Sequence, residues 1–318
     1  MDRIVECVPN FSEGRDRATI QALIDAVVSV PGVRLLHHTF DYDHHRSVMT
    51  VVGDPEDVTE AMFRAIRVAT DLIDLRKHAG AHPRVGATDV VPFVPIRGVS
   101  MHDCVQAARR LGHRIGTELE IPVFLYERAA SHSDHAPLES VRRGGLEGLS
   151  FRMASDPDWT PDFGPTRPHK SAGAIVIGVR PPLIAFNVNL ASTDLALAQS
   201  IARTVRQSNG GLRHVKAIGV ELPSRRLVQV AMNLTDYETT PIYAAFKAVQ
   251  AEAARQDVLV AGTEIVGLVP APALSEAMRH ALALERFDPG QILEVRMEAE
   301  LARAAQSPQP AKNAAGTK

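Results

Sequence analysis

The order of the predicted elements indicates an α+β protein made of two ferredoxin-like βαββαβ sandwiches. Short β-rich runs and amphipathic helices follow one another as strand, helix, strand, strand, helix, strand. The second half of the chain repeats that order with little sequence identity. Elements that begin at residues 4, 33, 48, 55 and 88 have counterparts that begin at residues 183, 215, 227, 240 and 265. Each such unit folds as an antiparallel sheet with two helices on one face.

In the first half, apolar spacing and turn residues set the bounds of each element. The run 4–8 predicts a strand, and Ser12 is expected to cap a helix whose apolar face extends to Val28. The further predicted elements are strands at 33–39, 48–52 and 88–94, a turn at 40–45 and a helix at 55–75. An extension follows, with a helix at 101–118, a strand at 123–126 and a Gly/Pro-rich stretch to about Gly173.

The second half gives the matching elements and the domain bounds. Thr193 is expected to cap a helix that runs to about Gln207. The other predicted elements are a strand at 183–190, a hairpin of 215–221 with 227–233, a helix at 241–255 and a strand at 265–269. We therefore expect an N-terminal subdomain at 1–178, a C-terminal subdomain at 179–304 and a disordered polar tail at 305–318.

Composition excludes several classes of protein. The 318 residues suggest two domains at about 150 residues each. A net charge of -2 gives no general attraction to nucleic acid. No apolar run approaches the length of about 18 residues that a membrane helix needs. The acidic start resembles no secretory signal, and two cysteines fit a reducing compartment, so we expect a cytoplasmic protein.

The stretch from His78 to Gly86 is the strongest candidate for chemistry. Its glycines and proline make it a loop between a helix and a strand, where functional groups concentrate. Pro83 keeps the backbone of His82 extended, and an imidazole titrates in the range needed for proton transfer near neutrality. Arg84 offers a charged fork for a carboxylate, and Asp89 could orient the imidazole or pair with Arg84. The alternative interpretation is a surface loop with two solvated histidines.

A second cluster, His37 to Arg46, mixes imidazoles with carboxylates. Such a mixture invites a metal site or a metal-dependent hydrolase. The pair His78 and His82 spans Gly80 and precedes a proline, however, and neither Cys-x-x-Cys nor His-Glu-x-x-His occurs. The pattern favours a polar β-turn with an anion-binding Arg46 over a metal site.

Three other features carry polar groups in suggestive places. The run 6–14 sets acids, Asn10 and a serine where a strand meets a helix, as an anion site or as simple capping. The loop 162–173 contains Arg167, His169 and Lys170, and is either a ligand clamp or a linker. Asn187 and Asn189 alternate along one strand, so both amides are expected on one face. Walker, Gly-x-Gly-x-x-Gly and Gly-x-Ser-x-Gly motifs are missing from the sequence, which argues against common nucleotide and serine-hydrolase sites.

These motifs resemble the glutamate formimidoyltransferase family, in the stand-alone form without a cyclodeaminase domain. The resemblance depends on H-x-G-x-H-P-R-x-G-x-x-D-V-x-P-F-x-P at 78–95, on ECVPNFSEG at 6–14 and on DFGP at 162–165. Weaker matches are FNVNL at 186–190 and GLVP at 267–270. Together they cover almost the whole chain except the tail.

The resemblance implies transfer of a formimidoyl group from N-formimidoyl-L-glutamate to N5 of tetrahydrofolate, in histidine degradation. It assigns catalysis to His82, with tetrahydrofolate as co-substrate and no metal. The implied substrate-binding residues are Asn10, His45, Arg46, Arg84 and Asp89. The implied folate-binding residues are Gly164, Pro165, Thr166, Arg167, Pro168, His169, Lys170, Ser171, Ala172 and Gly173.

Partners and alternatives follow from the same resemblance. It implies small-molecule substrates, a homodimer and, in some organisms, a separate cyclodeaminase, with no nucleic acid or membrane partner. Relatives commonly have Asp and Asn where this chain has His37 and His45. Folate-dependent formyl transfer to or from glutamate is therefore an alternative, and a non-catalytic folate-binding module is another.

Overall fold

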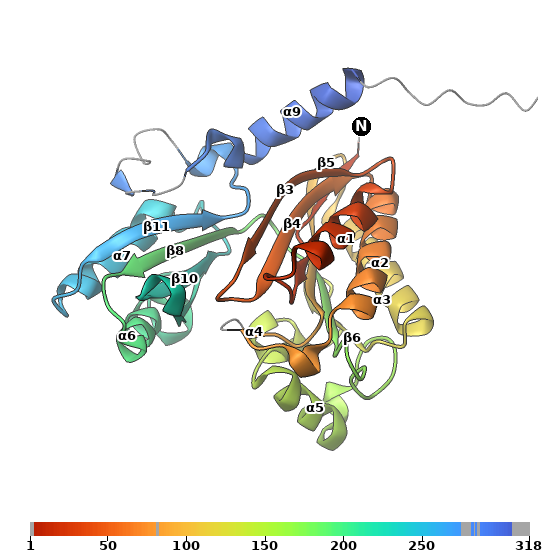
Figure 1. Cartoon of the computed structure of the whole chain (residues 1–318), viewed down its shortest axis with the longest axis horizontal. Coiled ribbons are helices and arrows are strands. Elements are labelled where there is room, and N and C mark those ends of the chain that lie inside the picture. Colours follow the sequence, from red (N-terminus) through yellow and green to blue (C-terminus); the bar gives the residue numbers. More distant parts are fainter. Residues whose placement is uncertain (1–2, 81–82, 275–280, 283, 285–286, 307–318) are drawn as a thin grey trace, which may run out of the picture.

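The computed structural model describes residues 3–80, 83–274, 281–282, 284 and 287–306, and it contains two sheets (Figure 1). The first sheet has seven strands, and each of its central strands pairs on both sides. Its strands are β1 (Ile4–Cys7), β2 (Asn10–Phe11), β3 (Arg34–Asp41), β4 (Arg46–Gly53), β5 (Thr88–Arg97), β6 (Val123–Glu127) and β7 (Ile175–Val179). Its helices are α1 (Arg17–Val28), α2 (Pro55–Leu72), α3 (Met101–Glu118), α4 (Leu138–Val141) and α5 (Gly145–Ser155).

The second sheet has four strands in the order β11-β8-β10-β9. Its strands are β8 (Ile184–Leu190), β9 (Val215–Leu222), β10 (Leu227–Leu234) and β11 (Val260–Val266), and its helices are α6 (Leu195–Val205) and α7 (Ile242–Ala254). The helix α9 (Leu293–Gln306) lies above both units in Figure 1.

Both units have the ferredoxin-like strand order, which confirms the predicted fold class. In the first unit β1 and β2 lie between β4 and β5, all antiparallel. In the second unit β8 lies between β10 and β11, again antiparallel. The first strand of each unit is thus flanked by the third and the fourth. The first sheet then continues through parallel pairs to β7 and β6.

Alternation along β4 decides which side chains face the helices of the first unit. Met49 and Val51 belong to the core that these helices cover, whereas Val52 packs in a smaller cluster with Leu293 of α9. Side chains two residues apart share a face of a strand. Arg46 therefore lies on the face opposite α1 and α2, beside Asn10, whose strand partner is Val48.

Two predicted helix caps were wrong, one by four residues and the other by a single residue. Asp16, rather than Ser12, caps α1, because its carboxylate accepts the Ala18 N–H at 3.0 Å. The Ser12 hydroxyl instead donates to the carbonyl of Gly86 at 2.7 Å. Asp194, next to the predicted Thr193, caps α6 in the same way. In both helices the capping carboxylate directly precedes the first helical residue, which places it within reach of the first free N–H groups.

Other differences lie where the chain is rich in glycine and proline. The stretch predicted as irregular before Gly173 contains α4 and α5, and β7 follows it as a fully buried strand. The last strand is Val260–Val266 rather than 265–269, and Gly267 leaves it with a φ of +83°. The predicted tail begins inside α9, and residues 307–318 lie outside the described residues.

Besides the packing of Leu293 against β4, the subdomains contact each other at two corners. Lys216 of β9 forms an ion pair with Glu139 of α4 at 2.9 Å, and Ser224 donates to Asp43 beyond the tip of β3 at 2.5 Å. We propose the domain boundary at residues 180–183, since β7 ends at Val179 and β8 begins at Ile184. Within the described residues, no helix combines the length and hydropathy that a membrane-crossing segment requires.

Candidate active site

The loop that carries the predicted catalytic histidine is fixed at both described ends. Arg84 Nη2 donates to the carbonyl of His78 at 2.7 Å and so closes the loop on itself. His78 Nε2 donates to the carbonyl of His45 at 2.9 Å, and the two imidazole rings stack with centroids 4.1 Å apart. His82 itself lies outside the described residues. The ends of the loop are therefore held against the β3–β4 turn.

Burial disfavours the protonated form of both stacked imidazoles. Burial is the main cause that lowers the pKa of His78 to about 4, with the charge of Arg84 adding to it. Burial also lowers the pKa of His45, against the opposing charge of Glu13. The N–H of Gly14 donates to Nδ1 of His45 at 3.1 Å, so that nitrogen is an acceptor. Neither ring is a proton donor of the strength that protonated imidazole offers.

Asp89 is 2% exposed and joins the loop to an arginine that sequence analysis missed. Its Oδ1 accepts the N–H of Val85 at 2.8 Å, and its Oδ2 forms an ion pair with Arg142. Burial lowers the pKa of Arg46 to about 10, and the positive charge of Arg142 contributes, while Asp89 opposes the shift. The guanidinium groups of Arg46 and Arg142 thus both lie within electrostatic reach of one buried carboxylate.

Arg142 gave no local signal of function. It follows α4, in the stretch that was expected to be irregular, and its partner Asp89 is 53 residues away in sequence. A charge-assisted contact of that kind is created by the packing of α4 on the sheet, through the cluster that contains Val90, Phe124 and Val141.

The predicted folate-binding loop lies directly against the histidine loop. Ala87 donates to the carbonyl of Ala172 at 2.9 Å, and Ala174 donates to Val85 at 2.9 Å. His169 and Gly173 exchange backbone hydrogen bonds of 2.8 and 3.0 Å. The early part of the loop is more open, since Gly164, Thr166, Arg167 and Lys170 are all exposed. Charged groups of this loop can therefore meet a ligand from solvent.

Gly86 lies against the backbone of the neighbouring loop at Gly173 and Ala174, so Gly86→Ala is expected to be harmful. A Cβ there would lie 1.9 Å from the carbonyl oxygen of Ala174 and 2.5 Å from that of Thr88. Both are backbone atoms that cannot move independently. Overpacking of this kind costs about 1–3 kcal/mol. Denaturant titration should show that loss, with a raised KM for the folate substrate; an unchanged midpoint would mean that the loops separate easily.

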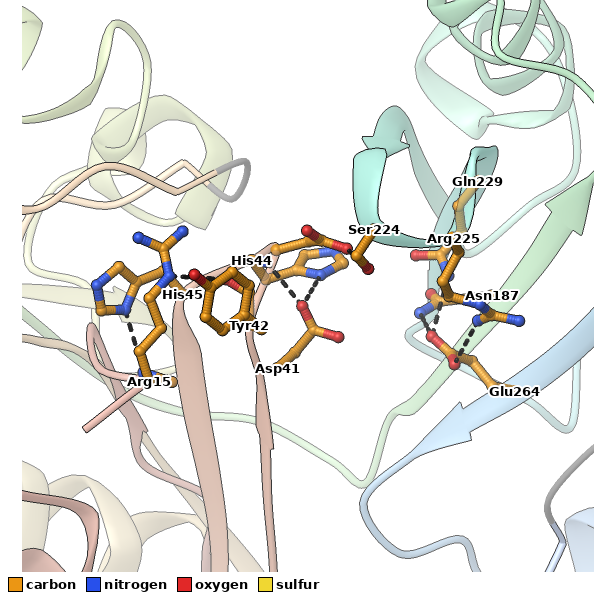
Figure 2. A network of polar contacts seen from close by, with 12 residues as sticks. Arg15, Asp41, Tyr42, His44, His45, Asn187, Ser224, Arg225, Gln229 and Glu264 are labelled. Atoms are coloured by element: carbon orange, nitrogen blue, oxygen red, sulfur yellow. Dashed lines mark hydrogen bonds and ion pairs between the residues drawn. The ribbon is translucent and has the colours of Figure 1, made fainter. Parts of the chain in front are cut away.

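The structure also describes three other polar residues of the predicted clusters, Asn10, His37 and His44. Asn10 is partly buried on β2, and its amide donates to the carbonyl of Val8 at 3.0 Å. His37 lies apart from the loop: burial lowers its pKa, and Arg296 of α9 is the next cause. His44 donates to the carboxylate of Asp41 at 2.8 Å (Figure 2).

Over the part of the chain that the structure describes, no three His, Cys, Asp or Glu side chains are grouped to hold a metal ion.

The amides of β8 lie on one face, as the alternation predicts. Asn187 donates to Glu264 of β11 at 3.0 Å. Gln229 of β10 donates to the same Glu264 oxygen at 2.9 Å and to Asn189 at 2.8 Å. Figure 2 shows the labelled members of this network across from the β3–β4 turn.

Two ferredoxin-like units, with an arginine- and histidine-rich loop on the sheet of the first, define a two-subdomain α+β protein with a site suited to anionic ligands. The chain belongs to the formiminotransferase family. Residues 4–180 match the N-terminal subdomain of the formiminotransferase domain, and residues 185–294 match the formiminotransferase domain model that follows it.

Named relatives cover most of the chain. It is 44% identical to glutamate formimidoyltransferase of Streptococcus pyogenes serotype M1, over 91% of this chain and 96% of that protein. It is 46% identical to glutamate formimidoyltransferase of Thermoplasma acidophilum, over 93% and 97%. Formimidoyltransferase-cyclodeaminase of Rattus norvegicus is 43% identical over 87% of this chain, which spans 52% of that longer protein.

Proposed function

We propose that this protein is an enzyme that transfers the formimidoyl group from N-formimidoyl-L-glutamate to N5 of tetrahydrofolate, giving 5-formimidoyltetrahydrofolate and glutamate. Family membership and the names of the relatives support this activity. One structural observation supports it further: the histidine loop and the predicted folate-binding loop are hydrogen-bonded side by side through Val85, Ala87, Ala172 and Ala174. A folate held by the second loop lies next to the first.

The reaction needs proton transfer and charge recognition. N5 of tetrahydrofolate attacks the amidine carbon, and the tetrahedral intermediate collapses with loss of glutamate. We assign His82 to accept the N5 proton and to return a proton to the departing nitrogen. Guanidinium groups on the face of the sheet opposite α1 and α2, Arg46 first among them, would hold the carboxylates of the donor. Tetrahydrofolate is the co-substrate, and the steps as written need no metal.

A turnover assay that follows glutamate release tests the proposed function. Glutamate released from formimidoylglutamate should depend on added tetrahydrofolate. N-formylglutamate is the matched alternative donor. It has a carbonyl oxygen where formimidoylglutamate has the imino nitrogen of its amidine. Faster release from formylglutamate would indicate formyl transfer, consistent with the histidine at position 45. Folate binding without release from either donor would indicate a binding module.

Arg46→Lys is expected to raise the KM for the amino-acid donor about 10- to 150-fold. Lysine keeps the charge but lacks the planar fork, so one charge-assisted hydrogen bond of about 1.5–3 kcal/mol is lost. The KM for tetrahydrofolate should change little. Steady-state kinetics with each substrate varied in turn measures both. An unchanged donor KM would leave Arg46 with a structural role beside Asp41 and Asp89 and would remove it from the donor site.

Assembly and location belong to the same proposal. We propose a cytoplasmic homodimer. A separate cyclodeaminase would process the product, because the animal relatives carry both activities in their names.

A further inference from the structure

Positive charge exceeds buried negative charge around Asp89. Asp89 binds Arg142 directly, and its charge acts on both Arg46 and Arg84. Asp89 is the only carboxylate among these described contacts that is buried. The other two that act on the arginines, Asp41 and Glu147, are exposed. Solvent screens exposed charges far better than buried ones, so the site has room for one further negative charge.

Arg84 and Arg142 each keep N–H donors, and they differ in what anchors them. Arg84 gives one Nη to the carbonyl of His78 and so closes the loop, and its Nε is buried without a hydrogen-bond partner among the described residues. Arg142 gives one Nη to Asp89, and its Nε is buried without a hydrogen-bond partner among the described residues. Its side chain keeps 13% of its surface exposed, enough to reach a small ligand. A guanidinium has five N–H donors, so Asp89 leaves most of them for another acceptor.

Arg46 and Arg142 flank the histidine loop from its two ends. Arg46 follows His45, which stacks on His78 at the start of the loop. Asp89, which holds Arg142, accepts the N–H of Val85 just after Arg84. A ligand bound between the two arginines is therefore adjacent to the loop that carries His82.

We propose that Arg142 completes, with Arg46, a site that binds one carboxylate of the amino-acid donor, and that Asp89 holds Arg142 in position. This inference rests on the proposed function for the identity of the ligand. The substrates of that reaction carry carboxylates on the donor and on the folate tail. The donor is the occupant, because the site borders the histidine loop, whereas exposed Arg167 and Lys170 on the neighbouring loop suit the folate tail.

Direct binding and kinetics together test the site. Calorimetry with glutarate, in the absence of folate, should show at least about tenfold weaker binding to Arg142→Lys, because the lysine loses the fork while it keeps the charge. The donor KM should rise by a similar factor, with the KM for tetrahydrofolate unchanged. If the Arg142→Lys variant has a lowered melting temperature, Arg142→Gln tests the same contact, because its amide can still donate to Asp89. Arg143→Lys is the matched control, since Arg143 is the exposed neighbour.

The outcomes separate this inference from the proposed function. An Arg142→Lys enzyme with unchanged glutarate affinity and donor KM overturns the site, as does a rise confined to the KM for tetrahydrofolate. A wild-type protein that binds glutarate through Arg142 but releases no glutamate from formimidoylglutamate refutes the proposed function and leaves the carboxylate site standing.

Discussion

Replacing His82 with alanine is expected to lower turnover about 10²–10⁴-fold, the range for loss of a general acid–base group. Asn should be as poor, because a carboxamide is neither basic nor acidic enough to act as a general acid–base group near neutrality. The two imidazoles that the structure describes at this loop, His78 and His45, are unsuitable substitutes. The pKa of His78 is lowered to about 4, and Nδ1 of His45 accepts a backbone hydrogen bond. The kcat at saturating donor and tetrahydrofolate measures the effect.

The same experiment has a matched control in His102→Ala. His102 is exposed on α3, far from the loop in sequence, and its removal should leave kcat unchanged. Both variants should keep the melting temperature of the parent, since neither a loop histidine nor an exposed histidine on α3 contributes much to core packing. Near wild-type kcat in His82→Ala would show that another group moves the proton and would end this mechanism.

Local sequence patterns were enough to predict the two ferredoxin-like units. Alternation in strands and 3.6-residue periodicity in helices are short-range signals, and the helix predicted at 101–118 is found at Met101–Glu118. β7 carried a signal too, since its five residues form one buried apolar run. It was missed because a short apolar run alone does not separate a buried strand from a loop that packs on the core.

The site depends on contacts that no local pattern contains. His78 bonds to His45 across 33 residues, and Asp89 to Arg142 across 53. The sequence indicated Arg46, Arg84 and Asp89 as neighbours of a site. It could not show that Arg84 closes its own loop, or that α4 brings a further guanidinium. Those facts require the packed positions of α4 and of the β3–β4 turn.

Asp89→Ala is expected to lower the free energy of unfolding by about 3 kcal/mol. Removing one partner of a buried ion pair costs about 3–5 kcal/mol, because it leaves the other charge uncompensated. The lower end applies here, since the exposed part of Arg142 can be rehydrated. The N–H of Val85 also loses its acceptor. Denaturant unfolding measures the loss, and Glu118→Ala, which breaks exposed pairs with Arg67 and Arg114, should cost at most about 1 kcal/mol. Equal losses in the two variants would place Asp89 outside any buried pair.

Removing both partners should separate stability from binding. The double variant Asp89→Ala with Arg142→Met is expected to be more stable than the sum of the single losses predicts, because Arg142 is no longer left as an unpaired charge when Asp89 is removed. Donor binding should not recover with it, since the guanidinium is gone. If the double variant regained both stability and the wild-type donor KM, Arg142 would have served only to neutralise Asp89, and the carboxylate would bind through Arg46 without it.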